Sequence, residues 1–129
     1  MSTGPACTAH SPIGGACPSA LIAAGRVRKI TCSFPRQPDS HHFDARYRAG
    51  AIELEVVPQG NLAERIRAGG AGIGAFYTPT GVGTPLAKGK EVRVIDGRSY
   101  VLEFALKADF ALIKAHRCDG HGNLTYRKT

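Results

Sequence analysis

Glycine is concentrated in one part of this chain, at Gly69, Gly70, Gly72, Gly74, Gly81 and Gly83. Ordering a glycine costs about 0.5–1 kcal/mol more than ordering an alanine, so a plain connector would be an unfavourable place for six of them. We therefore predict that the run 57–84, which contains them, needs bare backbone. A close approach between chain segments and a bound ligand would each create that need.

Short strand patterns alternate with short helix patterns around this run, which predicts an α/β layer fold. The turn signal Asp96-Gly97-Arg98 between two strand patterns predicts an added antiparallel β-hairpin. Asn61 with Glu64 three positions later resembles a capping box and predicts a helix start at Asn61. The elements expected are helices over 20–24, 40–49 and 61–68, strands over 27–34, 52–57, 91–95 and 99–104, a buried strand over 110–115, and an extended piece over 124–126.

The first 18 residues differ from the rest of the chain in composition. They are rich in proline and glycine and show no hydrophobic period, so we expect a disordered or unrelated tail over 1–18. The remainder, 19–129, is then expected to be one domain.

The chain carries a formal net charge of +7, which favours anionic partners. The cations are scattered among carboxylates without a nucleic-acid signature, so we do not expect nucleic acid as a partner. No apolar stretch reaches the roughly 18 residues of a membrane span, and the first residues lack the pattern of a secretory signal. We therefore expect a cytoplasmic protein without a membrane partner, whose four cysteines are reduced thiols.

Several sequences that resemble known binding motifs lack the spacing or the flanking elements that those motifs require. Residues 70–75 fit the G-x-G-x-x-A form of a dinucleotide site, but they follow a helix pattern and do not open one. Residues 83–90 lack the spacing and the hydroxyl of a Walker loop. Two Cys-x-x-His pairs, at 7–10 and 118–121, lie in a ligand-poor sequence, so we expect no metal site. Neither a nucleophile elbow nor a spaced carboxylate pair is present, and we expect no catalytic residue on this chain.

The remaining candidate is Pro58-Gln59-Gly60, at the end of a predicted strand, where open α/β sheets bind their ligands. The glycine loops follow, and their backbone N–H groups can hold a carboxylate, a thioester oxygen or a phosphate. A surface turn at Gln59 and tight loop packing at the glycines are the alternatives that involve no ligand.

At these residues the sequence resembles one of the two kinds of subunit, A-type and B-type, that make up the class I CoA-transferases. The resemblance is to the A-type and rests on VPQGNLAERIR at 57–67 and TPTGVGT at 78–84, with ADFALIKAH at 108–116 and GNLTYRK at 122–128 in support. Within the family, CSFPRQ at 32–37 is most similar to the 3-oxoadipate form, with the succinyl-CoA:3-oxoacid form as its close relative.

The resemblance implies the layered α/β fold shared with ribose-5-phosphate isomerase, which is incomplete here. It also implies a heteromer of A-type and B-type subunits that moves CoA from succinyl-CoA to a 3-oxoacid. It also implies a glutamyl-CoA thioester on the B-type subunit, because no glutamate here precedes Asn-Gly as the family's nucleophile does. CoA is then a substrate, and no cofactor is expected. The residues expected to bind substrate or CoA are Gln59, Gly70, Gly72, Gly74, Thr78, Gly81, Gly83 and Arg36.

The family's Gly-Gly-Phe loop, its Asn-Asn segment and its C-terminal part are absent from this sequence. Missing strands would leave Ile30, Val56 and Leu112 partly uncovered, so we expect a truncated A-type subunit that is inactive or unstable. The alternatives are the A-type subunit of an acetoacetate-using transferase and an inactive remnant or binding protein.

Arg36 generates a prediction about substrate choice. A dicarboxylic 3-oxoacid has a second carboxylate, which a guanidinium can bind through two parallel hydrogen bonds. We expect Arg36→Ala, placed in a full-length A-type subunit with its B-type partner, to lower the rate with 3-oxoadipate more than with acetoacetate. Steady-state kinetics with both acceptors test this, and an equal loss for the two would rule out the selectivity role.

Overall fold

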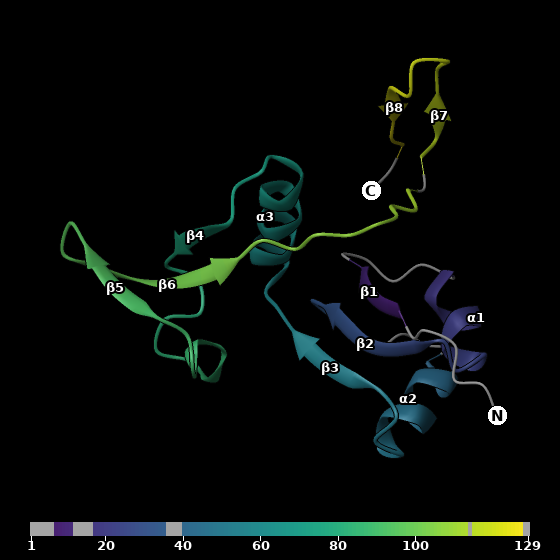
Figure 1. The fold of residues 1–129 in the computed structure, drawn as a ribbon, viewed down its shortest axis with the longest axis horizontal. Helices are drawn as coiled ribbons and strands as arrows, with labels where there is room; N and C mark the ends of the chain where they lie inside the picture. The colour runs from purple at the N-terminus through teal and green to yellow at the C-terminus, as the bar shows by residue number, and fades with distance from the viewer. Residues whose placement is uncertain (1–6, 12–16, 36–39, 114, 128–129) are drawn as a thin grey trace.

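The computed structural model describes residues 7–11, 17–35, 40–113 and 115–127, and its elements are arranged openly around a central helix, α3 (Figure 1). A three-stranded sheet lies on each side of α3, and a two-stranded hairpin stands apart from both. The elements follow in the order β1 (Cys7–Ser11), α1 (Cys17–Ala23), β2 (Val27–Cys32), α2 (His41–Arg48), β3 (Glu53–Val56), α3 (Gln59–Gly70), β4 (Ala75–Thr78), the 3₁₀ helix η1 (Pro85–Ala87), β5 (Val92–Ile95), β6 (Arg98–Phe104), β7 (Arg117–Cys118) and β8 (Leu124–Thr125).

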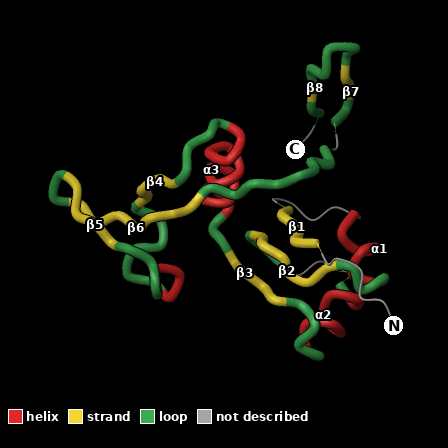
Figure 2. The backbone as a smooth tube through the Cα atoms, in the orientation of Figure 1, coloured by secondary structure: helices red, strands yellow, loops and turns green. Residues whose placement is uncertain are grey.

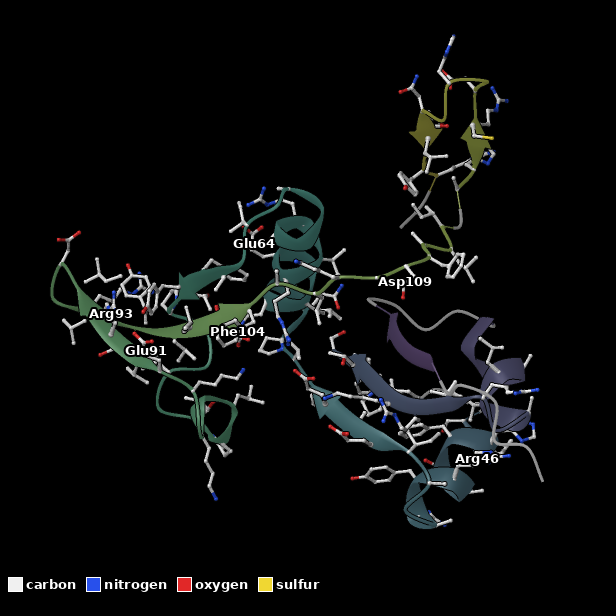
Figure 3. The ribbon with its side chains drawn as sticks, viewed as in Figure 1. Arg46, Glu64, Glu91, Arg93, Phe104 and Asp109 are labelled. Carbon is white, nitrogen blue, oxygen red and sulfur yellow. The ribbon has the colours of Figure 1, made fainter. Side chains whose placement is uncertain are left out.

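Strands β1, β2 and β3 form a parallel sheet in that order, which requires a crossover in each connection. Helices α1 and α2 supply the crossovers and pack against each other. Arg46 of α2 reaches α1 and donates from Nη2 to the Ala23 carbonyl oxygen at 3.0 Å (Figure 3). The apolar core of this half comprises Ile22, Val27, Ile30, Cys32, Phe43 and Ile52, with Leu54 packed against it.

A polar stripe crosses the same sheet. Lys29 and Thr31 of β2 are in register with Glu53 and Glu55 of β3, and alternation along a strand places all four on one face. Thr31 is nevertheless fully buried. The Thr31 and Glu55 end of the stripe therefore lies against other parts of the chain, where α3 supplies Arg65.

The second sheet is antiparallel, in the order β4-β6-β5, and both β4 and β6 contact α3. Strands β5 and β6 are joined at Asp96 (φ 49°) and Gly97 (φ 75°). Two successive positive φ values are the signature of a type I′ turn, whose twist suits a two-residue hairpin. Leu62 of α3 and Val101 of β6 are almost completely buried, so the helix and this sheet share apolar contacts.

The structure confirms the predicted α/β layers, the three helices before the glycines and the β5–β6 hairpin. The prediction of disorder is wrong for Cys7–Ser11, which form β1, and α1 begins at Cys17, inside the same range. Strand β4, within the glycine run, was not anticipated from the sequence. The domain boundary after residue 18 stays a prediction.

The predicted buried strand over 110–115 is wrong for the described part of that range. Residues 110–113 and 115 are not in a strand, and Phe110, Leu112 and Ile113 are 89%, 80% and 62% exposed. Figure 2 shows this stretch as loop, leading from β6 to the β7–β8 hairpin. An apolar run signals burial only where another layer is available to cover it. Of the residues expected to be uncovered, Leu112 and Val56 are exposed, whereas Ile30 is buried in the first sheet's core.

The capping box predicted at Asn61 is also wrong. Helix α3 begins two residues earlier, with Pro58 as its N-cap and without a side-chain cap. Asn61 is buried and donates from Nδ2 to Glu103 Oε1 and the Thr80 carbonyl oxygen, at 3.4 Å each. Glu64 instead binds Arg67 on the outer surface of α3 (Figure 3). Asn61 is thus taken up by tertiary partners and Glu64 by a neighbour on the same helix, so neither side chain forms the local motif.

One of the predicted close approaches lies at Gly69, near the end of α3. A Cβ added there would lie 2.0 Å from the carbonyl oxygen of Leu106. The same backbone pairs with α3 nearby, because the Leu106 N–H donates to the Arg65 carbonyl oxygen at 2.9 Å. The segment after β6 can therefore lie directly on the helix only where the helix has no side chain.

Replacement of this glycine is expected to destabilise the fold. Gly69→Ala should lower the free energy of unfolding by about 1–3 kcal/mol, the usual cost of overpacking, because a backbone atom cannot rotate away as a side chain can. Urea unfolding followed by circular dichroism measures this. Gly70→Ala is the matched control, because its Cβ would meet nothing within 4 Å and alanine favours a helix, so stability should be unchanged or higher. Equal effects of the two variants would contradict the close approach.

Candidate functional site

The C-terminal ends of β2 and β3 lie side by side. The Val57 N–H, just after β3, donates to the carbonyl oxygen of Cys32, the last residue of β2, at 3.0 Å. The next polar side chains on the two segments meet, since Ser33 Oγ donates to Gln59 Oε1 at 2.5 Å. Gln59 is exposed and Ser33 half-buried. A polar, accessible pair therefore occupies the sheet edge where parallel α/β folds bind ligands.

Helix α3 begins at this edge. Pro58 at its N-cap has no N–H, no side chain caps the helix, and its first turn contains no acidic residue. The first N–H groups of any α-helix lack partners within it and carry a partial positive charge. At Gly60 an added Cβ would meet nothing within 4 Å. The amide of Gln59 is thus placed beside backbone donors that suit a carboxylate or a developing oxyanion.

The other predicted site residues form two groups. Thr78 is the last residue of β4, and Gly81 lies in the turn that follows. This turn approaches the start of α3 through the hydrogen bond from Asn61 to the Thr80 carbonyl oxygen. In this turn the Thr78 hydroxyl accepts from the Thr80 N–H at 3.3 Å, and Gly81 and Gly83 have positive φ values. These residues therefore have a role in the turn itself, whether or not a ligand binds there.

Gly70, Gly72 and Gly74 lie at or beyond the far end of α3. Gly70 lies eleven positions after Gln59, and a rise of 1.5 Å per residue places about 16 Å of helix between them. Only a long ligand could contact both ends. Gly72 has a positive φ of 74°, whereas Gly70 and Gly74 have neither a positive φ nor a close contact at their Cβ positions. Arg36, the remaining predicted site residue, lies outside the described residues.

An ionic network runs beneath the site and joins the two sheets. Arg65 donates from Nη1 to Glu55 of β3 and from Nε to the Phe104 carbonyl oxygen of β6, at 2.7 Å each. Lys29 binds the other oxygen of Glu55 at 3.1 Å. Glu103, which is 3% exposed, binds Lys90 at 2.6 Å and lies 3.9 Å from Arg65. This cluster, with Asn61 donating to Glu103, sets the position of the first half of α3.

Burial by itself would raise the pKa of Glu55, but hydrogen bonds from Arg65 and Lys29 outweigh it and hold this pKa at about 2. Glu55 is therefore ionised at neutral pH and is not a proton donor. Every other glutamate also has a cationic partner, Glu53 with Lys29, Glu64 with Arg67, Glu91 with Arg93 and Glu103 with Lys90. These pairs give all five carboxylates structural partners (Glu91 and Arg93 are labelled in Figure 3).

The described residues contain no group of three or more His, Cys, Asp or Glu side chains that could hold a metal ion. Burial raises the pKa of the Cys32 thiol, next to Ser33, which keeps it in the unreactive thiol form. Within the part of the chain that is described, no helix combines the length and apolar character that a membrane crossing requires.

Two important residues were missed in the sequence. Ser33 follows one strand as Gln59 follows the next, and this repeated placement of polar residues at strand ends was the available signal. Arg65 lies between Leu62 and Ala68 at a helical spacing of three, so a charged residue interrupts the buried stripe of α3. Such an interruption signals a buried ion pair.

Comparisons with known proteins give a consistent result. The family model described as Coenzyme A transferase matches residues 5–129. The chain is 73% identical over 110 residues to the A-type subunit of 3-oxoadipate CoA-transferase from Pseudomonas putida, covering 85% of this chain and 48% of that protein. It is 63% identical to the subunit of the same name from Acinetobacter baylyi, covering 84% of this chain and 48% of that protein. It is 57% identical to the A-type subunit of succinyl-CoA:3-ketoacid coenzyme A transferase from Xanthomonas campestris, covering 84% of this chain and 44% of that protein. The chain thus spans about half the length of these relatives.

Among solved structures, a variant of the decarboxylase AibA/AibB matches with a TM-score of 0.71, covering 91% of this chain and 48% of that one. At 19% identity this likeness concerns the fold alone. It confirms the predicted α/β fold class.

The ion pairs of Glu55 generate a prediction of pH dependence. Because the folded-state pKa is depressed to about 2 from 4.5, the stabilisation is complete above pH 4.5 and is lost as the pH falls toward 2. After allowance for solvent screening of this half-buried group, we expect it to amount to about 1–2 kcal/mol. Urea unfolding across this range should show wild-type stability falling toward that of Glu55→Gln, and a constant gap between them would contradict the assignment. Glu64→Gln, which breaks a surface pair, is the control and should change the pH profile little.

Proposed function

Because this chain belongs to the coenzyme A transferase family, we propose that it forms part of the A-type subunit of a 3-oxoacid CoA-transferase that moves CoA from succinyl-CoA to 3-oxoadipate. The names of the relatives that are 73% and 63% identical support this substrate over other 3-oxoacids. CoA acts here as a substrate, and the reaction needs no cofactor. We place the activity in the cytoplasm, in keeping with the expectation from the sequence.

The observation that carries this proposal is the position of Gln59 at the joined ends of β2 and β3, on the uncapped start of α3. Acyl transfer places negative charge on the carbonyl oxygen in the transition state. A side-chain amide N–H and helix-start N–H groups are donors of the kind that stabilise such an oxygen. Gln59 would therefore bind the acyl oxygen, first of the thioester and then of the carboxylate product.

The nucleophile is proposed to come from the B-type subunit. Its carboxylate attacks the thioester carbonyl, the acyl group passes to that carboxylate as CoA thiolate leaves, and the thiolate then attacks the mixed anhydride to give the glutamyl-CoA thioester and free succinate. The glutamates of this chain are all engaged in ion pairs, which supports a separate source. The acceptor 3-oxoacid takes CoA by the reverse sequence.

The long CoA molecule offers a reason why glycines occur at both ends of α3. About 16 Å of helix separates Gln59 from Gly70, and a compact 3-oxoacid could not span this length. We assign the acyl group to the Gln59 end. The bare backbone at Gly70 and Gly74 is assigned to the extended part of CoA, since a Cβ at either would meet nothing within 4 Å in the chain itself.

Two alternatives have support of their own. The 57% identity to a succinyl-CoA:3-ketoacid transferase subunit favours acetoacetate as a second possible acceptor. The exposure of the large apolar side chains of Phe110 and Leu112 favours a non-catalytic binding protein or remnant. Activity in the presence of the B-type subunit discriminates among the three.

The test co-expresses this chain with the B-type subunit of a 3-oxoadipate CoA-transferase, and 3-oxoadipyl-CoA formation from succinyl-CoA is followed by chromatography. We expect a stable complex with transferase activity. Gln59→Glu, which replaces the donor N–H groups by an oxygen of similar size, should lower kcat by about 100-fold, as loss of an oxyanion donor does. Glu64→Gln on the outer side of the same helix is the control and should retain activity.

A wild-type pair without transferase activity toward 3-oxoadipate or acetoacetate would overturn the proposal and favour the remnant. Activity that is higher with acetoacetate than with 3-oxoadipate would support the CoA-transferase reaction but would make acetoacetate the acceptor in place of 3-oxoadipate. Full activity of Gln59→Glu would exclude Gln59 from the acyl site.

A further inference from the structure

The contact between Ser33 and Gln59 joins residues from two different strand ends. Ser33 Oγ donates to Gln59 Oε1 at 2.5 Å, which is short for a hydrogen bond between neutral groups. Ser33 is held close to Gln59 because the adjoining backbones are themselves joined, from the Val57 N–H to the Cys32 carbonyl oxygen. Ser33 as a residue is half-buried, whereas Gln59 is exposed.

A glutamine amide has two chemically opposite ends, an oxygen that accepts and an NH₂ group that donates. An exposed glutamine can rotate to present either end to a ligand, so it discriminates poorly between acceptor and donor atoms. Here the serine occupies Oε1, and none of the hydrogen bonds found among the described residues uses Nε2. The NH₂ group is therefore the end of the amide with both of its hydrogen-bonding positions left for a ligand.

We propose that Ser33 is a positioning residue, which fixes the Gln59 amide with its NH₂ group toward the ligand and so restricts the site to ligands that present an acceptor oxygen. The inference rests on the proposed function for its ligand class, a thioester carbonyl or a carboxylate. Ser33 acts through Gln59 and does not contact the substrate.

This arrangement reduces the reorganisation needed during reaction. Donors that already point at the developing oxyanion need no reorientation as charge builds up, and this is how preorganised sites lower a barrier. An amide that rotated freely would have to be ordered in each cycle. Loss of the serine hydroxyl should therefore affect kcat more than KM, because the ordering matters most in the transition state.

The first experiment uses the chain alone, without any reaction. Side-chain NH₂ resonances of Gln59 are identified in ¹⁵N-labelled protein by their disappearance in Gln59→Glu, and their heteronuclear NOE reports the mobility of the amide. Ser33→Ala and Ser33→Val should shift these resonances and lower the NOE, whereas Ser33→Thr, which matches valine in size and keeps the hydroxyl, should leave both close to wild type. Ser40→Ala is the matched control, because the Ser40 side chain makes no cap hydrogen bond to α2.

Unchanged Gln59 resonances and NOE in Ser33→Val would overturn the proposal, and so would equal changes in Ser33→Thr and Ser33→Val. The backbone amide spectrum checks that each variant is folded. Should Ser33→Ala fail to fold, the threonine and valine pair still decides, since the two differ only in the hydroxyl.

The second experiment measures kcat and KM for succinyl-CoA in the complex with the B-type subunit. We expect Ser33→Val to lower kcat by about tenfold with KM changed less than about twofold, and Ser33→Thr to restore kcat. Equal kcat for the valine and threonine variants in an active complex would refute the positioning role. An inactive wild-type complex would refute the proposed function, while the ordered amide in the first experiment would still support Ser33 as its positioning residue.

Discussion

The Arg65 guanidinium joins the two halves of this structure. It extends from α3 between the sheets, with Nη1 on Glu55 of β3 and Nε on the Phe104 carbonyl oxygen of β6. Around it, three cations (Lys29, Arg65 and Lys90) are matched by three carboxylates (Glu53, Glu55 and Glu103). A buried guanidinium is costly to desolvate unless each N–H finds a partner in a fixed direction. The cluster therefore holds α3 to both sheets, through Glu55 on one side and the Phe104 carbonyl oxygen on the other.

The candidate site depends on that placement. The start of α3 is held from one side by Asn61, which bonds to Glu103 and to the turn after β4, and from the other by the backbone link between β2 and β3. Gln59 lies within this frame but outside the network itself, so its amide is exposed while its backbone is fixed. Rigid support beneath an accessible donor is the arrangement that preorganised binding requires. The ionic cluster thus supports the site by fixing the start of α3, which carries Gln59.

Periodicity in the sequence predicted the elements that are stabilised locally, including the helices and the β5–β6 turn at Asp96-Gly97. Predictions from periodicity were wrong where contacts with residues distant in the sequence determine the structure. Asn61 has the sequence of a cap but bonds across to Glu103, and residues 110–113 have the sequence of a buried strand but no layer over them. Gln59 could be selected because it follows a strand pattern, whereas the bond from Ser33 depends on a strand register that no local pattern encodes.

The glycines fall into three groups: one required by a close backbone contact, those required by a positive φ, and those with neither reason. Gly69 is required by the carbonyl oxygen of Leu106, and positive φ values account for eight others, including Gly72, Gly81 and Gly83. Gly60 and Gly70, the second and last residues of α3, have neither explanation, although ordering a glycine costs more conformational entropy than ordering any other residue. Nothing in the described part of the chain offsets that cost. A ligand that approaches the helix backbone closely would do so, and Gly60, beside Gln59 at the uncapped start of α3, is where such an approach would meet the donors of the proposed acyl site.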